Sequence, residues 1–144
     1  EPTEVFAAAS CLVEPELERL GEVDTAMVTL KTASGALCQI NTSYRTTFGY
    51  DQRTEVFGSK GMVTTSNLRP TSVERYTAAG TCRDNLLYYF LERYTESYRL
   101  ELDSFIDAVS KGMTPSPGIE DGRRALLLVV AAAQSHRTGA PIKF

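Results

Sequence analysis

The 144-residue chain is long enough for one domain with a hydrophobic core, and its 42% hydrophobic content is ordinary for a globular protein. Its formal net charge of -3 gives no reason to expect nucleic acid or an anionic membrane as a partner. No apolar run approaches the roughly 18 residues of a membrane-spanning helix. The longest run, 125–133, predicts a helix buried among its neighbours.

Alternating apolar and polar residues predict strands in the first half of the chain. They cover residues 5–10, 22–32, 36–44, 50–57, 62–66 and 72–77. We expect an antiparallel meander with one apolar face, which includes Val28 and Leu30, and one face rich in Thr, Ser, Gln and Asn. The pattern allows two roles for the polar face. It could contact solvent, or it could be a subunit interface in which Met27 and Leu37 supply apolar contacts.

The second half predicts helices. An apolar stripe of helical period runs over residues 86–110, with Asp84 or Asn85 as the capping residue. A second helix follows a proline-rich link and ends before Gly139, and residues 141–144 could add a short strand. Strands followed by helices predict an α+β fold, in which a largely antiparallel open sheet has helices packed on one face.

The three cysteines, Cys11, Cys38 and Cys82, form no C-x-x-C pair, and any disulfide would leave one of them over. This favours reduced thiols in a cytoplasmic protein, and the cysteines are expected to be small core side chains rather than metal ligands. The single histidine, His136, cannot form a histidine-based metal site alone. We therefore expect no metal.

The segment 50–57 is polar where an ordinary core strand would be apolar, so it should meet a polar ligand, a partner or water. A phenol donates and accepts hydrogen bonds and a carboxylate accepts them, so Tyr50 and Asp51 suit a neutral ligand rich in hydroxyl groups. From the residues alone, the simpler interpretation is a packed Tyr50 ring and an Asp51 that pairs with Arg53 or Arg45.

The long predicted helix carries Tyr94 and Tyr98 on one stripe, beside the polar Arg93 and Ser97. Tyrosines at such positions are more often core residues than ligand contacts, although these neighbours allow a partly wet surface. The sequence contains no G-x-G-x-x-G, P-loop, H-E-x-x-H or G-x-S-x-G motif, and residues 58–61 predict a hairpin turn rather than a phosphate loop. The residues alone therefore supply no positioned base, metal or redox group.

Several segments nevertheless form a recognisable set, namely 4–7, 21–26, 48–61, 98–109 and 121–126. Together they resemble the C-terminal domain of the Gfo/Idh/MocA oxidoreductases, and most closely the inositol 2-dehydrogenase branch. The run Gly-Tyr-Asp-Gln-Arg within 48–61 is fairly specific to that branch, whereas Phe-Ile-Asp-Ala-Val within 98–109 marks only the wider superfamily. The resemblance covers nearly the whole chain. It implies a dihydrodipicolinate-reductase-like C-terminal domain that associates through its open sheet face into oligomers.

The resemblance also implies a two-domain parent, and we expect the chain, which begins at Glu1, to be a piece of that longer protein. A preceding Rossmann domain would bind NAD. Hydride would leave a polyol carbon while a Lys, an Asp and a His outside this chain handle the hydroxyl proton. No catalytic residue is expected here, and neither Lys60 nor His136 takes that role, so the chain alone should be inactive.

What the resemblance does assign is a wall of the substrate pocket. Tyr50 matches a family tyrosine that reaches an inositol hydroxyl, and Tyr98, more closely than Tyr94, matches tyrosines that line the same pocket. Asp51 and Arg53 are expected to support the strand. The implied activity is the NAD-dependent oxidation of myo-inositol to the 2-keto compound, scyllo-inosose. The alternatives are another polyol or sugar dehydrogenase of the superfamily, or a non-catalytic module that binds a polyol or dimerises.

Overall fold

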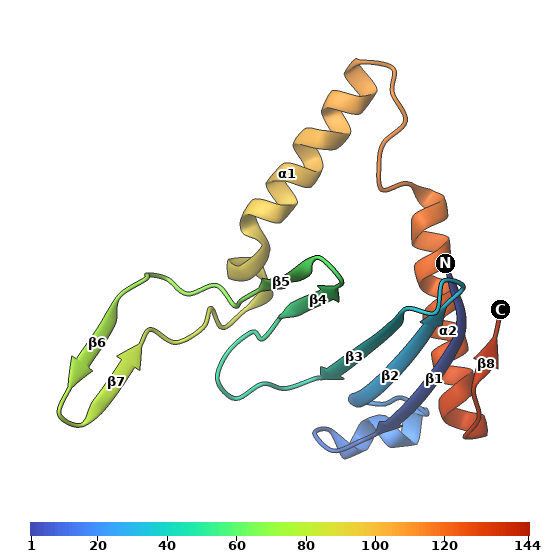
Figure 1. Cartoon of the computed structure of the whole chain (residues 1–144), viewed down its shortest axis with the longest axis horizontal. Helices are drawn as coiled ribbons and strands as arrows, with labels where there is room; N and C mark the ends of the chain where they lie inside the picture. Colours follow the sequence, from blue (N-terminus) through green and yellow to red (C-terminus); the bar gives the residue numbers. More distant parts are fainter. The chain divides into compact units, whose positions relative to one another are not determined.

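The computed structural model describes residues 1–144, which divide into two compact units. Unit 1 comprises residues 1–45 and 114–144, and unit 2 comprises residues 46–113. Figure 1 colours the chain along its sequence, and both ends of the chain belong to unit 1. None of the helices combines the length and the apolar character needed to cross a membrane.

Unit 1 contains a four-stranded antiparallel sheet with the strand order β3-β2-β1-β8. Its strands are β1 (Pro2–Ser10), β2 (Thr25–Thr32), β3 (Leu37–Ser43) and β8 (Ile142–Lys143). A 3-10 helix, η1 (Pro15–Leu20), lies between β1 and β2 in the chain. The strands predicted over 5–10, 22–32, 36–44 and 141–144 are therefore confirmed, with ends that differ by up to three residues.

Helix α2 (Ile119–Thr138) covers one face of this sheet (Figure 1). Val5 of β1 lies opposite Leu30 of β2 in the register, and both are buried in one cluster with Ala131 of α2. The buried Ser135 hydroxyl accepts a hydrogen bond from the Ala7 N–H at 3.0 Å and donates one to the Ala140 carbonyl at 2.8 Å. The end of α2 is thus fastened to β1 by polar as well as apolar contacts.

Asp24, which the sequence analysis did not single out, organises the loop that leads into η1. Its carboxylate accepts hydrogen bonds from the N–H groups of Leu12, Val13 and Glu14 at 2.7–2.9 Å and from the Thr25 hydroxyl at 2.8 Å. Burial pushes the pKa of Asp24 upward, but these hydrogen bonds to the ionised form outweigh it and leave the pKa well below its usual range. An ionised, buried carboxylate therefore holds the loop.

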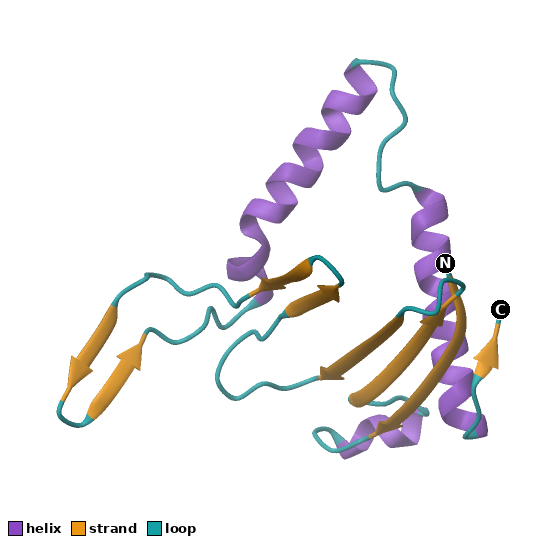
Figure 2. Cartoon of the chain, viewed as in Figure 1, coloured by secondary structure: helices purple, strands orange, loops and turns teal.

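Unit 2 contains two separate β-hairpins and one long helix (Figure 2). These elements are β4 (Thr54–Gly58), β5 (Gly61–Thr65), β6 (Glu74–Thr77), β7 (Gly80–Arg83) and α1 (Phe90–Ser110). The prediction of a single meander is therefore wrong, because β4–β5 and β6–β7 each form their own two-stranded sheet. Strand β7 was missed altogether.

The predicted strand 50–57 begins only at Thr54, and the reason lies in its side chains. The backbone N–H of Gln52 donates to the Asn67 side-chain carbonyl at 2.7 Å, and Asp51 binds the Arg53 guanidinium. The Asn67 side chain thus satisfies the backbone N–H of Gln52 and competes with the pairing of a regular ladder at this point. The hairpin turn predicted at 58–61 is confirmed by the pairing of Gly58 with Gly61.

Helix α1 begins at Phe90 rather than at residue 86, and neither Asp84 nor Asn85 caps it. The Asp84 carboxylate instead accepts a hydrogen bond from Thr71, and its backbone carbonyl accepts one from Arg69. Ala108 is the only buried residue of α1. The prediction of helices packed on one sheet face is thus confirmed for α2, whereas α1 belongs to the other unit.

Candidate functional site

A close approach of two backbone segments positions Tyr50 in unit 2. Gly49 has φ +121, and a Cβ atom at this position would lie 2.6 Å from the Cβ atom of Leu86. The next residue, Tyr50, donates its backbone N–H to the Leu87 carbonyl at 2.8 Å. Only glycine has both the conformational freedom and the small size for this position. The Phe-Gly-Tyr run therefore sets Tyr50 against the segment that leads into α1.

The structure brings together the three tyrosines that the sequence analysis assigned to the site. The ring centroids of Tyr50 and Tyr94 are 5.6 Å apart with an interplanar angle of 84°, and those of Tyr94 and Tyr98 are 6.2 Å apart at 64°. These are edge-to-face arrangements, which aromatic rings favour. We call Tyr50, Tyr94 and Tyr98 the tyrosine cluster. Tyr50 and Tyr94 are half-buried and Tyr98 is 48% exposed, so the cluster is not sealed under other elements.

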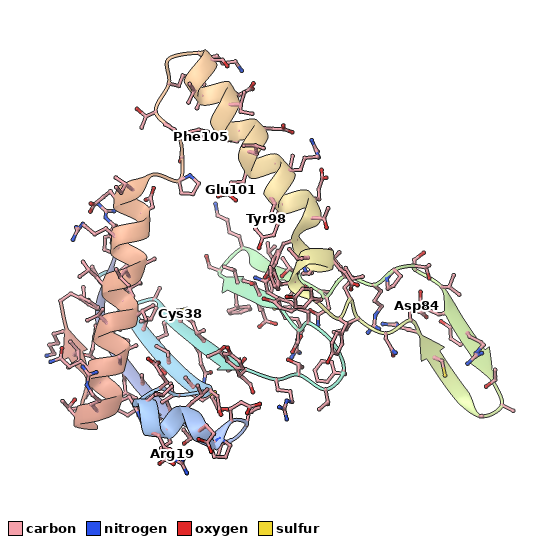
Figure 3. The ribbon with its side chains drawn as sticks, turned by 180° about the vertical axis from the view of Figure 1, so that it is seen from behind. Arg19, Cys38, Asp84, Tyr98, Glu101 and Phe105 are labelled. Atoms are coloured by element: carbon pink, nitrogen blue, oxygen red, sulfur yellow. The ribbon has the colours of Figure 1, made fainter.

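Figure 3 shows Tyr98 on the same side of α1 as Glu101 and Phe105, which follow it along the helix. This side of α1 is largely exposed, because Phe105 retains 53% of its accessible surface. The cluster thus lies at one end of an exposed helical surface. Along this surface the phenol of Tyr98 is followed by the carboxylate of Glu101 and the apolar ring of Phe105.

Tyr94 is the best-connected member of the tyrosine cluster. Its hydroxyl donates a hydrogen bond to Gln52 Oε1 at 2.6 Å, and the Arg93 guanidinium lies 5.2 Å from the centre of its ring. Burial and the neighbouring Tyr50 phenol raise the pKa of Tyr94, so Tyr94 stays neutral near pH 7. The buried Arg93 Nε has no hydrogen-bond partner within the chain. Sequence reasoning missed Gln52, although its position two residues after Tyr50 was a usable signal.

Asp51 acts as structural support rather than as an open ligand contact. Arg53 binds its two carboxylate oxygens at 2.8 Å each, and Asn67 donates a further hydrogen bond to it. These contacts with Arg53 and Asn67 lower the pKa of Asp51. The pairing with Arg53 is one of the two that the sequence predicts, while Arg45 pairs with Glu14 instead at 2.8 Å.

Unit 2 also contains a cavity of about 290 Å³ that includes none of the tyrosine cluster. Its lining residues are Phe48, Asp51, Arg53, Asn67, Arg69, Asn85 and Leu86. The charged groups in this lining already have partners within the chain, because Arg53 binds Asp51 and Arg69 donates to the Asp84 carbonyl. The cavity is therefore less suited to a polar ligand than the tyrosine cluster.

Two other candidate chemical groups belong to other elements of the chain. Lys60 belongs to the turn between β4 and β5, and His136 lies in the last turn of α2 in unit 1. All three cysteines are free thiols, but the prediction of core cysteines is wrong, because Cys38 and Cys82 are exposed and Cys11 is only half-buried. No group of three His, Cys, Asp or Glu residues is arranged to hold a metal ion. The tyrosine cluster and the neighbouring Gln52 offer phenol groups and an amide, which suit a hydroxylated neutral ligand by hydrogen bonding.

Comparison with known proteins assigns the chain to a family. The whole chain, residues 1–144, matches the model of the oxidoreductase family C-terminal alpha/beta domain, the Gfo/Idh/MocA type. The chain therefore belongs to this family, as the resemblance in the sequence indicates, and it has the α+β fold expected for it.

Individual members of the family are similar to the chain over most of its length. It is 49% identical to the myo-inositol 2-dehydrogenase of Thermotoga maritima over 94% of this chain and 40% of that protein. It is 43% identical to the uncharacterized oxidoreductase YrbE of Bacillus subtilis over 99% of this chain and 42% of that protein. Among solved structures, a probable dehydrogenase from Thermotoga maritima superposes with a TM-score of 0.96 at 47% identity, covering 99% of this chain and 43% of that one. The chain thus spans about two fifths of the length of the curated relatives it matches.

Proposed function

We propose that residues 1–144 form the substrate-binding and oligomerisation domain of an NAD-dependent inositol 2-dehydrogenase. In this proposal the full-length enzyme oxidises the 2-hydroxyl of myo-inositol to the ketone of scyllo-inosose. A Rossmann domain outside these residues binds NAD and receives the hydride. The Lys, Asp and His that handle the proton also lie outside this chain. The 49% identity to a myo-inositol 2-dehydrogenase supports the proposal.

The observation that carries the proposal is the tyrosine cluster. A neutral, hydroxyl-covered ring needs several donors and acceptors but little net charge, and phenols supply these without the cost of burying ions. The Tyr50 and Tyr94 rings stand edge to face, and the Tyr98 ring follows on the same helix as Tyr94. We assign substrate contacts to these three side chains. In this role they bind and orient the ring, and they exclude water from one side of it.

A kinetic experiment on the full-length protein tests the proposal. The protein is assayed with NAD against a panel of inositols and aldoses, and Tyr50→Phe is expected to lower kcat/KM for myo-inositol roughly tenfold, the scale of one hydrogen bond. Tyr76→Phe is the matched control, because Tyr76 is 72% exposed on β6 and outside the cluster. Equal kinetics of Tyr50→Phe and wild type would remove Tyr50 from the site.

The same panel separates the proposal from its nearest alternative. The 43% identity to an uncharacterized oxidoreductase leaves room for another polyol or sugar dehydrogenase of the family. Faster oxidation of an aldose or of a different inositol isomer would favour that alternative, and the comparison of NAD with NADP would identify the coenzyme.

We place the enzyme in the cytoplasm, in agreement with its free thiols.

We further propose that the sheet face opposite α2 joins subunits of the oligomer. Phe6, Met27 and Leu37 lie on that face by register and are 41%, 48% and 75% exposed. Charged substitution of Met27 to Glu should lower the sedimentation coefficient of the full-length protein toward that of a monomer. Leu12→Glu is the control, because Leu12 is 73% exposed in the loop after β1. A wild-type monomer at micromolar concentration would reject the interface.

A further inference from the structure

Gln52 decides what the Tyr94 hydroxyl can offer to a ligand. A phenol has one proton to donate, and Tyr94 gives it to Gln52 Oε1 at 2.6 Å. The remaining lone pairs of the Tyr94 oxygen can only accept a hydrogen bond. A group that meets this oxygen must therefore donate a proton, which a hydroxyl does and a ketone or ether oxygen does not.

Gln52 is itself fixed by a chain of polar contacts that starts at its backbone. Its N–H donates to Asn67 Oδ1 at 2.7 Å, and the amide nitrogen of Asn67 donates to Asp51. Asp51 is held in turn by two hydrogen bonds of 2.8 Å from Arg53. These contacts take the place of strand pairing at residues 51–53, so they give the Gln52 side chain a defined point of attachment.

The Tyr94 ring is restrained on its other sides by the side chains of two neighbours. The Tyr50 ring packs edge to face against it, and the Arg93 guanidinium lies 5.2 Å from its ring centre. These contacts hold the ring, while the hydrogen bond to Gln52 Oε1 sets the direction of the hydroxyl proton. Removal of the Gln52 acceptor would free the hydroxyl to rotate and to donate elsewhere.

We propose that Gln52 is a positioning residue: by accepting the Tyr94 proton, it leaves the Tyr94 oxygen able only to accept a hydrogen bond from a ligand. The tyrosine cluster therefore selects a ligand hydroxyl at this point. The inference deepens the proposed function, on which its kinetic consequence rests. Gln52 need not touch the substrate, because it acts through Tyr94. The hydrogen bond between the two side chains is a property of this chain whatever the substrate is.

The first test is a double-mutant cycle in the full-length enzyme with myo-inositol and NAD. Gln52→Met keeps the length of the side chain but removes the acceptor, and we expect kcat/KM to fall roughly tenfold, as for Tyr94→Phe. If Gln52 acts through Tyr94, the double variant should be no worse than Tyr94→Phe alone. Gln52→Glu keeps an acceptor oxygen and should stay within about threefold of wild type. The proposal would be overturned if the fold-losses in kcat/KM of the two single variants multiplied in the double variant. It would also be overturned if Gln52→Met had wild-type kinetics.

The second test does not depend on activity. Titration of tyrosine absorbance in the full-length protein, with Tyr94→Phe subtracted, reports the ionisation of Tyr94. Loss of the acceptor should lower the pKa of Tyr94 in Gln52→Met, because the neutral phenol loses its hydrogen bond, while the negative charge in Gln52→Glu should raise it. An unchanged pKa in both variants would overturn the positioning role. If the pKa of Tyr94 shifts in both variants but the wild-type protein oxidises no inositol, the positioning role stands and only the proposed function is rejected.

Discussion

The two units of the chain differ in how they hold their residues in place. Unit 1 buries Val5, Leu30 and Ala131 in one cluster under α2. In unit 2, Phe105 and Ile106 of α1 remain 53% and 52% exposed. Order around the tyrosine cluster comes instead from a close backbone approach and from side-chain hydrogen bonds. Unit 1 is thus stabilised mainly by its own apolar core, whereas unit 2 exposes polar groups and apolar surface.

Truncation of a leucine in each unit should give the largest contrast. Leu30→Ala removes a side chain that is 8% exposed and should lower the free energy of unfolding by about 2–5 kcal/mol. Leu102→Ala on α1, where the leucine is 59% exposed, should cost less than about 1 kcal/mol. Urea denaturation of the 144-residue chain measures both values. If both variants lost the same free energy of unfolding, the two units would not differ in how tightly they pack.

Two glycines, one in each unit, have positive φ angles but different surroundings. Gly35 of unit 1 has φ +86, and a Cβ atom added there would meet nothing within 4 Å, so Gly35→Ala should cost only backbone strain, about 1–3 kcal/mol. Gly49→Ala adds an overlap at 2.6 Å with Leu86 and should cost about 1–3 kcal/mol more.

The two alanine variants should also differ in catalysis. Gly49→Ala should lower kcat/KM of the full-length enzyme, because Gly49 precedes Tyr50 and its replacement would displace that phenol. Gly35→Ala, in the hairpin between β2 and β3, should leave kcat/KM unchanged. Denaturation and steady-state kinetics on the same samples check both statements. Two variants with equal stability and equal activity would show that the approach of Gly49 to Leu86 does not position Tyr50.

The smallest expected effect concerns two carboxylates with lowered pKa values, Asp24 in unit 1 and Asp51 in unit 2. A pKa below its unfolded value means stability that is complete above the ordinary carboxyl pKa of about 4 and is lost as pH falls toward the folded value. Asp24 has the larger shift, since three backbone N–H groups and the Thr25 hydroxyl bind it. Asp24→Asn should therefore flatten the loss of stability below pH 4 more than Asp51→Asn does. Unfolding measured at several pH values below about 5 gives the slope of the free energy of unfolding against pH. A wild-type slope in both variants would contradict this expectation.

The sequence predicts the strands of unit 1, because their alternation matches what the sheet buries under α2. The prediction that the helical run 125–133 is buried is wrong, since Leu126 and Val129 of α2 remain 63% and 64% exposed. Val28 and Leu30 alternate as a half-covered strand requires, and the end of α2 before Gly139 follows standard helix chemistry. Unit 2 is predicted less well. Local side-chain contacts override strand pairing at residues 51–53, and Asp84 binds Thr71 instead of capping α1.

The site divides in the same way. Tyr50, Tyr94 and Tyr98 could be selected from the sequence because the family resemblance marks their positions, and the structure brings them together. Gln52 was not selected. Its position two residues after Tyr50 was a usable signal, but its contact with Tyr94 joins residues 42 positions apart in the chain. Only the fold of unit 2 shows that an amide determines the direction of a phenol proton.

The most direct test of the tyrosine cluster as a substrate wall is a crystal structure of the full-length protein with NAD and myo-inositol. We expect inositol hydroxyl oxygens within hydrogen-bond distance, about 2.5–3.0 Å, of the Tyr50 and Tyr94 hydroxyls, with Tyr98 beside the ring. The hydroxyl facing Tyr94 should be the donor, because Gln52 still accepts the Tyr94 proton. An inositol molecule bound without contact to any of these tyrosines would show that the tyrosine cluster is not the substrate wall.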